Sequence, residues 1–452
     1  MAVYYTMLLG LSLCGALLCV KNRTRRKDGC YLLISFLVLA GVSAIRYDVG
    51  YDYSYIYAPA YESYLQDTTG EVFANHRFEP GFKLLIKVLM MFSRNYHMLF
   101  VVTSIITVAL VMLYYWLYSP NPFISVFLFV VLSQLYCSMD FIRQMIAASI
   151  AMFAFPMLKR RNIWGSIGYF AIVILAATFH KSALLLIPFF FINLIPSNKF
   201  VLAAYAAVTV AIYFNTERIV DFVTRYWYSG YSLNSQHMKV GFVPHFAIAL
   251  GIIFLIIFFS SNLLKEQGKH SYLYVNYAFF TFFFAFMGTR HSILDRLSMP
   301  FAMLTPVALA AVVHGLSIKL KEQPMAANVK RYANKYSMAL AGVLALIVFG
   351  GLAIHHYALY MDGHGVSRYR VIFAQPFYKE YVEQLKAEKE NAQYIIDGEE
   401  PIEQPEDIEV LELPAQPTSD SSPHQATLPE LSKSQSADGS PAEITIDEFL
   451  SG

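Results

Sequence analysis

Long apolar segments recur through most of this 452-residue chain, and they restrict it to one class of fold. About 20 mostly apolar residues can cross a bilayer as an α-helix, which satisfies its own backbone hydrogen bonds. Only 15% of the residues are charged, against roughly 25% in soluble domains. We therefore predict an all-α, polytopic bundle of transmembrane helices with about twelve crossings. The predicted crossings are 2–20, 30–45, 96–118, 123–139, 141–158, 163–179, 182–196, 199–214, 242–260, 271–288, 297–316 and 336–359.

One further apolar segment is too short and too charged for an easy crossing. Residues 81–93 follow Pro80 and contain Lys83 and Lys87. Ionised side chains are costly inside a bilayer. We predict that this segment is a short re-entrant or interfacial helix.

The end of the chain has a different composition. Residues 379–452 hold 18 acidic and four basic side chains, whereas residues 1–378 hold 30 basic and 14 acidic ones. An acidic segment with many Pro and Ser residues buries too little apolar surface to offset its chain entropy. We predict a transmembrane domain over 1–378 and a disordered acidic tail over 379–452.

The basic residues beside the helix ends predict the orientation. If 81–93 does not cross, one face receives 16 basic and three acidic side chains, and the other receives 14 basic and 11 acidic ones. Cytoplasmic loops carry the excess of Lys and Arg, so the first face is predicted to be cytoplasmic. The sequence therefore places the remaining charged motifs, and the tail, on the opposite face.

Two of these motifs stand beside apolar segments. Arg143, next to Gln144, can bind a phosphate or carboxylate through two hydrogen bonds, or it can pair with Asp140 and anchor its helix. His180 and Lys181 lie between two apolar helices with almost no loop. His180 is either a packed, hydrogen-bonded residue or a general base.

Two more motifs offer charges for a substrate. Arg290, His291, Asp295 and Arg296 stand in the segment TRHSILDR between two predicted crossings. Two arginines with an intervening carboxylate suit an anion, although an ordinary polar loop would have the same composition.

The second of these motifs follows the second predicted crossing. Arg46, Asp48 and Asp52 stand there among many tyrosines, including Tyr53. Aromatic rings and carboxylates suit a sugar, whereas tyrosines alone are typical of an interfacial belt. Glu79 precedes the rigid Pro–Gly pair at the start of the short helix.

No pattern in the sequence predicts a metal or a cofactor. Spacings typical of metal ligands do not occur. The four cysteines lie in or beside apolar segments and are interpreted as small apolar residues. We expect neither a metal nor a cofactor.

In the order of these motifs the chain resembles the EpsG family of bacterial exopolysaccharide polymerases, which are related in role to O-antigen polymerases. The resemblance covers roughly residues 1–375. In family sequences the first motif usually reads G-T-D-Y, and Tyr51 replaces the Thr here while Asp52 is retained. The matching elements are Arg46, Tyr47, Gly50, Asp52 and Tyr53; Glu79 to Phe82; Phe141, Arg143 and Gln144; Phe179, His180, Ser182 and Ala183; and Arg296.

The resemblance implies a multi-pass glycosyltransferase of the bacterial inner (cytoplasmic) membrane. It would join oligosaccharide repeat units carried on a polyprenyl diphosphate, on the periplasmic or exterior face, into exopolysaccharide, capsule or O-antigen. We expect the lipid-linked oligosaccharide and the bilayer as partners, a flippase and a chain-length regulator as candidate protein partners, and no nucleic acid. We predict catalytic roles for His180, Asp52 and Glu79, and substrate binding by Arg46, Asp48, Tyr53, Arg143, Gln144, Lys181, Arg290, His291, Asp295 and Arg296.

Three other functions compete with this one. A transporter or flippase for the same lipid-linked sugar would have charges at mid-membrane and repeat symmetry. A membrane acyltransferase would need its His within reach of a cytoplasmic donor, whereas His180 is predicted to face outward. An O-antigen ligase performs similar chemistry on a different acceptor, and the sequence leaves that alternative open.

Overall fold

The computed structural model of this chain describes residues 1–74, 77–160, 162–192, 195–227, 244–266, 271–290, 292–322 and 330–374. These residues are almost entirely helical, and a single bridge between Arg46 and Val371 is the only β pairing among them. The predicted all-α class is thereby confirmed. The predicted disorder of 379–452 concerns residues outside the described ranges.

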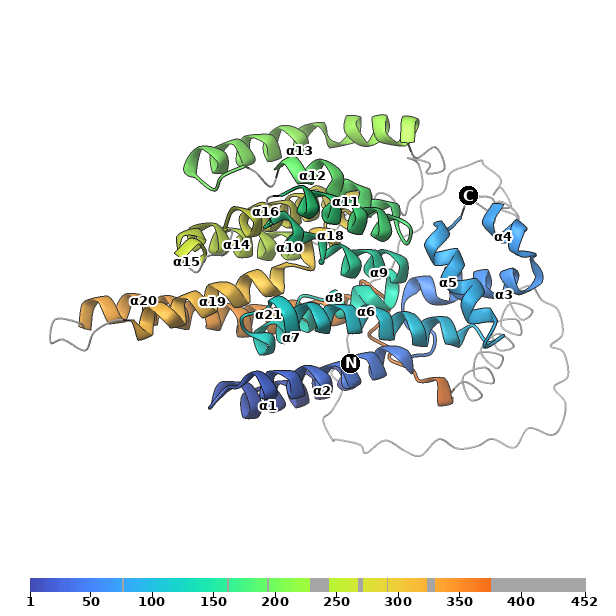
Figure 1. Ribbon diagram of the computed structural model, residues 1–452, viewed down its shortest axis with the longest axis horizontal. Helices are drawn as coiled ribbons and strands as arrows, with labels where there is room; N and C mark the ends of the chain where they lie inside the picture. Colours follow the sequence, from blue (N-terminus) through green and yellow to red (C-terminus); the bar gives the residue numbers. More distant parts are fainter. Residues whose placement is uncertain are drawn as a thin grey trace, which may run out of the picture. The chain divides into compact units, whose positions relative to one another are not determined.

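Long helices lie side by side through the bundle (Figure 1), with α2 packed along α6, and α14 along α16. The helices of the first half are α1 (Ala2–Gly15), η1 (Ala16–Val20), α2 (Arg25–Ala44), α6 (His97–Tyr118), α7 (Pro122–Val131), α8 (Gln134–Asp140), α9 (Ile142–Ala151), α10 (Ala154–Leu158), α11 (Ile163–Ala177), η3 (Lys181–Leu185) and α12 (Leu186–Ile192). Those of the second half are α13 (Lys199–Trp227), α14 (Pro244–Phe259), α15 (Ser261–Glu266), α16 (Ser271–Gly288), α17 (Ser292–Arg296), α18 (Met299–Ala302), α19 (Thr305–Lys321), α20 (Lys330–Ala345), η5 (Leu346–Gly350), α21 (Gly351–Met361) and η6 (Ile372–Ala374).

Each of the twelve predicted apolar segments is mostly helical where it is described, but the helices differ in length. Five helices are long and apolar enough to cross a membrane, or seven if each of two bent pairs forms one span. The other apolar helices have 10–17 residues, less than the roughly 20 that a crossing needs. The predicted count of about twelve crossings is therefore not confirmed.

Both bent pairs are broken by local backbone geometry. α7 and α8 meet at 55°, because Ser133 adopts a left-handed conformation with φ 63° and interrupts the helical hydrogen bonds. Leu294–Ala302 and α19 meet at 45°. The first break brings the end of α8 and the start of α9, around Asp140, toward the segment that follows α2.

Short helices lie at one end of the bundle (right in Figure 1). Much of the connection between α2 and α6, in which the sequence predicted only the short helix 81–93, is helical. It forms η2 (Tyr53–Tyr57), α3 (Ala58–Gln66) and α4 (Thr69–Ala74), followed by α5 (Pro80–Met90). The reason is a spacing of three to four residues between Tyr53, Tyr57, Tyr61 and Tyr64, which places all four on one buried face.

Helix α5 is the segment predicted to be re-entrant or interfacial. It has 11 residues, about 16 Å of helix, too little for a crossing. Its lysines hydrogen-bond backbone carbonyls: Lys83 Nζ binds Phe73 O, and Lys87 Nζ binds Tyr64 O and Asp67 O. These bonds explain how two lysines are tolerated in an apolar helix.

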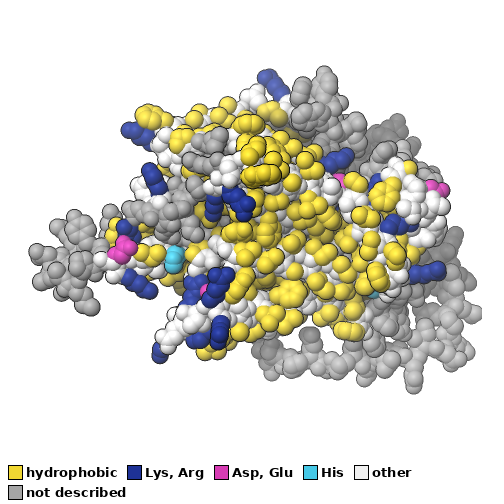
Figure 2. Space-filling view, viewed as in Figure 1, with side chains coloured by type: hydrophobic (Ala, Val, Ile, Leu, Met, Phe, Trp, Pro, Cys, Tyr) yellow, Lys and Arg dark blue, Asp and Glu magenta, His cyan; other side chains and the backbone are white. Residues whose placement is uncertain are grey.

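The opposite end of the bundle is basic. There α1 turns into α2, and α15 and the end of α19 lie at the same end (left in Figure 1). Figure 2 shows dark blue Lys and Arg side chains gathered at this end of a broad hydrophobic surface. The hydrophobic surface is what lipid-facing helices require, since lipid replaces water there.

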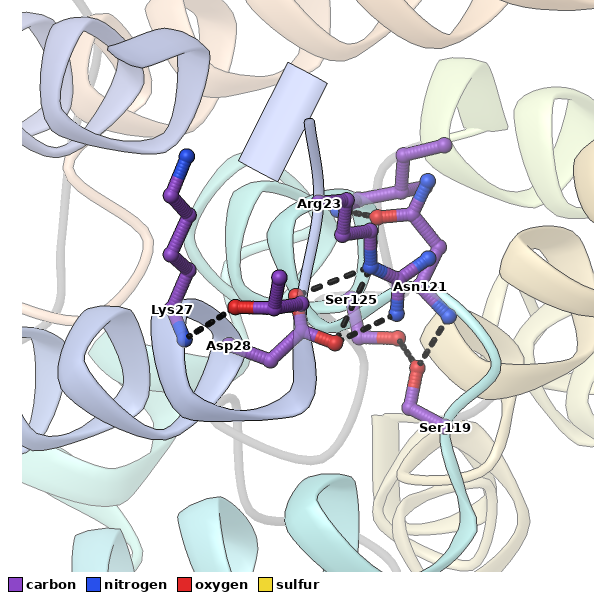
Figure 3. A network of polar contacts seen from close by, with 8 residues as sticks. Arg23, Lys27, Asp28, Ser119, Asn121 and Ser125 are labelled. Carbon is purple, nitrogen blue, oxygen red and sulfur yellow. Dashed lines mark hydrogen bonds and ion pairs between the residues drawn. The ribbon is translucent and has the colours of Figure 1, made fainter. Parts of the chain in front are cut away.

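A polar network fixes the start of α2 at this basic end (Figure 3). Thr24 caps the helix by accepting from Lys27 N, and Arg23 binds both carboxylate oxygens of Asp28 at 2.8 and 3.0 Å. Asn121 caps α7. The candidate site residues described next do not line the adjoining cavity of about 380 Å³, which is bounded by Arg23, Thr24, Arg25, Asp28, Trp116, Leu117, Ser119 and Pro122.

Candidate functional site

Glu79 joins three segments that are far apart in the sequence. Its Oε2 lies 2.6 Å from Nη1 of Arg143 at the start of α9, and its Oε1 accepts from the backbone N–H of Lys181 at 3.1 Å. The Glu79 side chain is only 8% exposed, so these charge-assisted bonds are shielded from water. The Arg143 guanidinium also lies 4.6 Å above the ring of Phe78.

A close backbone approach holds the same segments together. Gly81 N donates to Thr178 O at 2.8 Å. A Cβ at Gly81 would lie 2.4 Å from Thr178 Oγ1 and 2.8 Å from Thr178 O. Only glycine therefore fits where α5 begins against the turn after α11, and this contact brings Glu79 to the His180 turn.

His180 is neutral, and its hydrogen bonds show where its proton lies. Its Nδ1 lies 3.2 Å from the backbone N and 2.8 Å from the Oγ of Ser182. The backbone N–H can only donate, so we assign Nδ1 as the acceptor, without a proton. The neutral ring therefore has its proton on Nε2. Burial, with contributions from Arg143 and Arg296, lowers the pKa of His180 to about 4, although Glu79 acts in the opposite direction.

Asp52 lies near a second carboxylate. Its backbone N–H donates to Oδ1 of Asp140 at 3.1 Å. Burial and the Asp140 charge raise the pKa of Asp52 to about 6, against the opposing effect of Arg296, Arg143 and Arg77. A carboxylate with such a pKa is ionised at neutral pH and is a stronger base than an exposed one.

Gly50 places the Asp52 segment against the break between α8 and α9. It has φ 103°, and a Cβ there would lie 2.6 Å from Met139 O. A side chain at this position would meet both strain and a clash.

Arg143, at the start of α9, does not form the pair with Asp140 that was one of the two predicted alternatives. Arg143 pairs with Glu79 rather than with Asp140. Gln144 Nε2 donates to Arg296 O, and the Arg296 guanidinium lies 4.7 Å from the ring of Phe141. Arg296 is exposed, so its charge is open to an anion beside Phe141.

Three residues that were predicted to contact the substrate instead make contacts within the protein. Arg46 is fully buried, and it donates to Ser104 Oγ at 2.7 Å and to backbone carbonyls. Tyr53 is buried and stacks on Phe100 at 3.6 Å. Asp48 accepts from Arg370 Nη1 at 2.8 Å. The structure therefore does not support substrate contacts for Arg46 and Tyr53, since neither side chain is accessible.

The TRHSILDR residues divide between two environments. Arg290 Nη2 lies 3.7 Å from Glu217 Oε1, and its guanidinium faces Tyr213 on α13, so it does not join the Glu79 group. Asp295 interacts electrostatically with Arg296 and with a histidine near the chain's last helix, His364. His291 lies outside the described residues.

Sequence reasoning missed His364 and considered Asp140 only as a partner of Arg143. His364 follows α21 and carries no recognisable motif around it. Its Nδ1 lies 3.3 Å from Oδ2 of Asp140. Lys181, which was predicted, is exposed beside His180 and contributes its backbone N–H to Glu79.

Comparison with known proteins decides the family. The model of the EpsG family matches residues 29–327, about two thirds of the chain. The chain belongs to the EpsG family. Neither the curated proteins nor the solved structures contain a match to it.

Membership of the EpsG family, together with the apolar helices, makes this chain a membrane protein linked to exopolysaccharide polymerisation. The EpsG match includes every site segment described above except His364 and Arg370. Within the described ranges, three or more His, Cys, Asp or Glu side chains are nowhere grouped so that they could hold a metal ion.

Proposed function

We propose that this EpsG-family protein polymerises oligosaccharide repeat units carried on a polyprenyl diphosphate, on the outer face of the cytoplasmic membrane. The observation that carries the proposal is the meeting of Glu79, Arg143 and the His180 turn, with Asp52 and Arg296 nearby, at the end of the bundle opposite the basic one. Arginines suit a diphosphate, and a carboxylate suits a sugar hydroxyl.

In the proposed reaction a hydroxyl oxygen of the acceptor unit attacks the anomeric carbon of the donor. The new glycosidic C–O bond forms while the bond between that carbon and the diphosphate oxygen breaks, and polyprenyl diphosphate leaves with the electron pair. Asp52 takes the hydroxyl proton. Arg143 and Arg296 stabilise the charge that develops on the departing diphosphate.

Asp52 is the base that the hydrogen bonds favour. Both oxygens of Glu79 are already hydrogen-bonded, one by Arg143 and the other by the backbone N–H of Lys181, so they are engaged within the protein. The Nδ1 lone pair of His180 is used by Ser182, so His180 can donate from Nε2 but cannot readily accept. Within the described part of the chain the Asp52 carboxylate oxygens form no hydrogen bond, and they remain available to a hydroxyl.

The test uses purified protein in nanodiscs and the lipid-linked unit extracted from cells that lack this protein. Polymerase activity gives a ladder of products that increase by one repeat unit. A ligase would transfer one unit to a separate acceptor, and a transporter would leave the units unchanged. The absence of a ladder from folded protein that binds the substrate would overturn the proposal.

Arg143→Ala should abolish the ladder and leave single repeat units on their lipid. Losing one positively charged contact to the leaving group typically costs about 10²–10³ in rate. Because this change also leaves Glu79 without its ion pair, melting temperature and protein level are measured beside activity. Arg143→Lys keeps the charge and should retain part of the rate, and Arg94→Ala, at an exposed arginine between α5 and α6, is the matched control.

A further inference from the structure

A segment beyond the EpsG match lies against the candidate site. Residues 362–372, here called the C-terminal strap, follow α21 and lie against the Asp52 segment. Gly50 N donates to Gly365 O at 3.0 Å, Tyr47 N donates to Arg370 O at 2.9 Å, and Ile372 N donates to Ile45 O at 2.9 Å. The strap therefore fixes the backbone on both sides of Arg46.

The strap carries His364, whose side chain is largely covered and only 15% exposed. Its Nδ1 lies 3.3 Å from Asp140 Oδ2, and its Nε2 lies 3.4 Å from Cys137 Sγ. The ring also meets Phe141 edge-on at 5.4 Å. These contacts place His364 beside the junction of α8 and α9.

Asp140 connects His364 to Asp52. One of its oxygens accepts from the Asp52 backbone N–H at 3.1 Å, and the other faces His364 Nδ1. The Asp140 side chain is 1% exposed, and a buried carboxylate needs a hydrogen-bonded or charged partner. Among the described residues, the Asp140 carboxylate has two hydrogen-bond partners, His364 and the Asp52 N–H.

We propose that His364 is a positioning residue for Asp52: by holding Asp140, it fixes the backbone and the electrostatic surroundings of the segment that carries Asp52. The inference rests on the proposed function only in taking Asp52 as the catalytic base. It assigns a role to a residue outside the family match, 224 positions along the chain from its partner Asp140.

The charges around His364 and Asp52 determine whether the loss of His364 raises or lowers the pKa of Asp52. Burial alone would lower the pKa of His364, but Cys137 and Asp140 outweigh it and raise that pKa well above the ordinary value. A protonated His364 offsets the negative charge of Asp140, which otherwise disfavours a second carboxylate at Asp52. Among the described residues, the titratable and charged groups that interact with Asp52 or His364 are Tyr57 on η2, Asp140 and Cys137 on α8, Arg143 on α9, Asp295 and Arg296 on α17, and Arg77 before α5.

Two substitutions should then move the pKa of Asp52 in opposite directions. His364→Gln keeps a donor toward Asp140 but removes the positive charge, so the pKa of Asp52 should rise by roughly half a unit. Asp140→Asn keeps an acceptor for the Asp52 N–H but removes the negative charge, so that pKa should fall. His356→Gln, at an exposed histidine of α21 that hydrogen-bonds Tyr5, should leave the pKa of Asp52 unchanged.

The measurement needs no substrate. Dicyclohexylcarbodiimide reacts with protonated carboxyl groups in membrane proteins, and peptide mass spectrometry of the full-length protein in nanodiscs quantifies labelling at Asp52 at each pH. Wild-type protein should be half-labelled near pH 6. His364→Gln should move that midpoint upward and Asp140→Asn downward, while Asp52→Asn shows the background.

Midpoints that coincide in wild type, His364→Gln and Asp140→Asn would overturn the inference, whatever the polymerase assay gives. If His364→Gln does not fold, Asp140→Asn alone decides, since a midpoint that does not fall removes the electrostatic link. Failure of the wild-type protein to make a ladder would refute the proposed function and leave the labelling result intact. A ladder with unmoved midpoints would refute only the role of His364.

Discussion

Glu79, His180 and Asp52 differ as proton acceptors because their hydrogen-bond partners differ. Of these three, Asp52 is the one whose acceptor atoms form no hydrogen bond with the described residues. Its pKa of about 6 predicts the pH dependence of polymerisation. The reaction needs the ionised carboxylate, so kcat/KM should rise about tenfold per pH unit below 6 and level off above it. The profile is measured with the ladder assay.

Asp52→Asn should remove the dependence of kcat/KM on pH below 6. It should also lower the rate by about 10²–10⁴, the usual contribution of a general base. Glu62→Gln is the matched control, because Glu62 is an exposed carboxylate on α3 at the same end of the bundle. An unchanged pH dependence in Asp52→Asn would assign the base to another group.

The tautomer of His180 predicts a difference between two amides. Gln places its donor close to where Nε2–H stands, whereas Asn places its polar group close to Nδ1. His180→Gln should therefore retain activity within about tenfold, and His180→Asn should lose about 10²–10³, as expected when a donor to the reacting group is removed. Equal losses in both variants would show that His180 transfers a proton instead.

At the scale of elements, the contact between the start of α5 and the turn after α11 forms the site. Gly81→Ala should destabilise the protein by about 1–3 kcal/mol, because the added methyl meets Thr178. It should also reduce ladder formation, since Glu79 shifts relative to Lys181. Gly70→Ala is the control, because a Cβ at Gly70 meets nothing within 4 Å. Thermal melting in detergent checks both variants.

The sequence predicted these elements better than it predicted their contacts. Apolar length and the short, charged character of 81–93 indicate helices, because both depend on local composition. The break at Ser133 and the helices of the Tyr53 segment were missed, since a left-handed residue and a buried tyrosine face depend on tertiary packing. The count of about twelve crossings is not confirmed, because apolar composition alone does not distinguish a short buried helix from a span.

The site was predictable as a set of residues but not as a network. Charges beside apolar segments singled out Arg143 and His180, because such charges are costly in a membrane. The partner of Arg143 was not predictable, since Glu79 is 64 positions away and Asp140 is only three. His364 gave no local signal, and only the fold of the strap brings it to Asp140.

At the scale of the whole molecule, the basic end and the candidate site occupy opposite ends of the bundle, and this arrangement predicts the topology. Cytoplasmic loops are enriched in Lys and Arg, so the site should face outward. Because α5 has only 11 residues, the positions before and after it should lie on the same side of the membrane.

The side of the membrane on which each segment lies can be measured with single cysteines in a background that lacks Cys14, Cys19, Cys30 and Cys137. Thr69→Cys and Arg94→Cys flank α5 and are exposed, and both should react with a membrane-impermeant maleimide in intact cells. Lys21→Cys and Lys321→Cys, at the basic end, should react only after the membrane is permeabilised. If Thr69→Cys and Arg94→Cys label from different sides, α5 crosses the membrane, and either Glu79 or the start of α6 must then be reassigned to the cytoplasmic face.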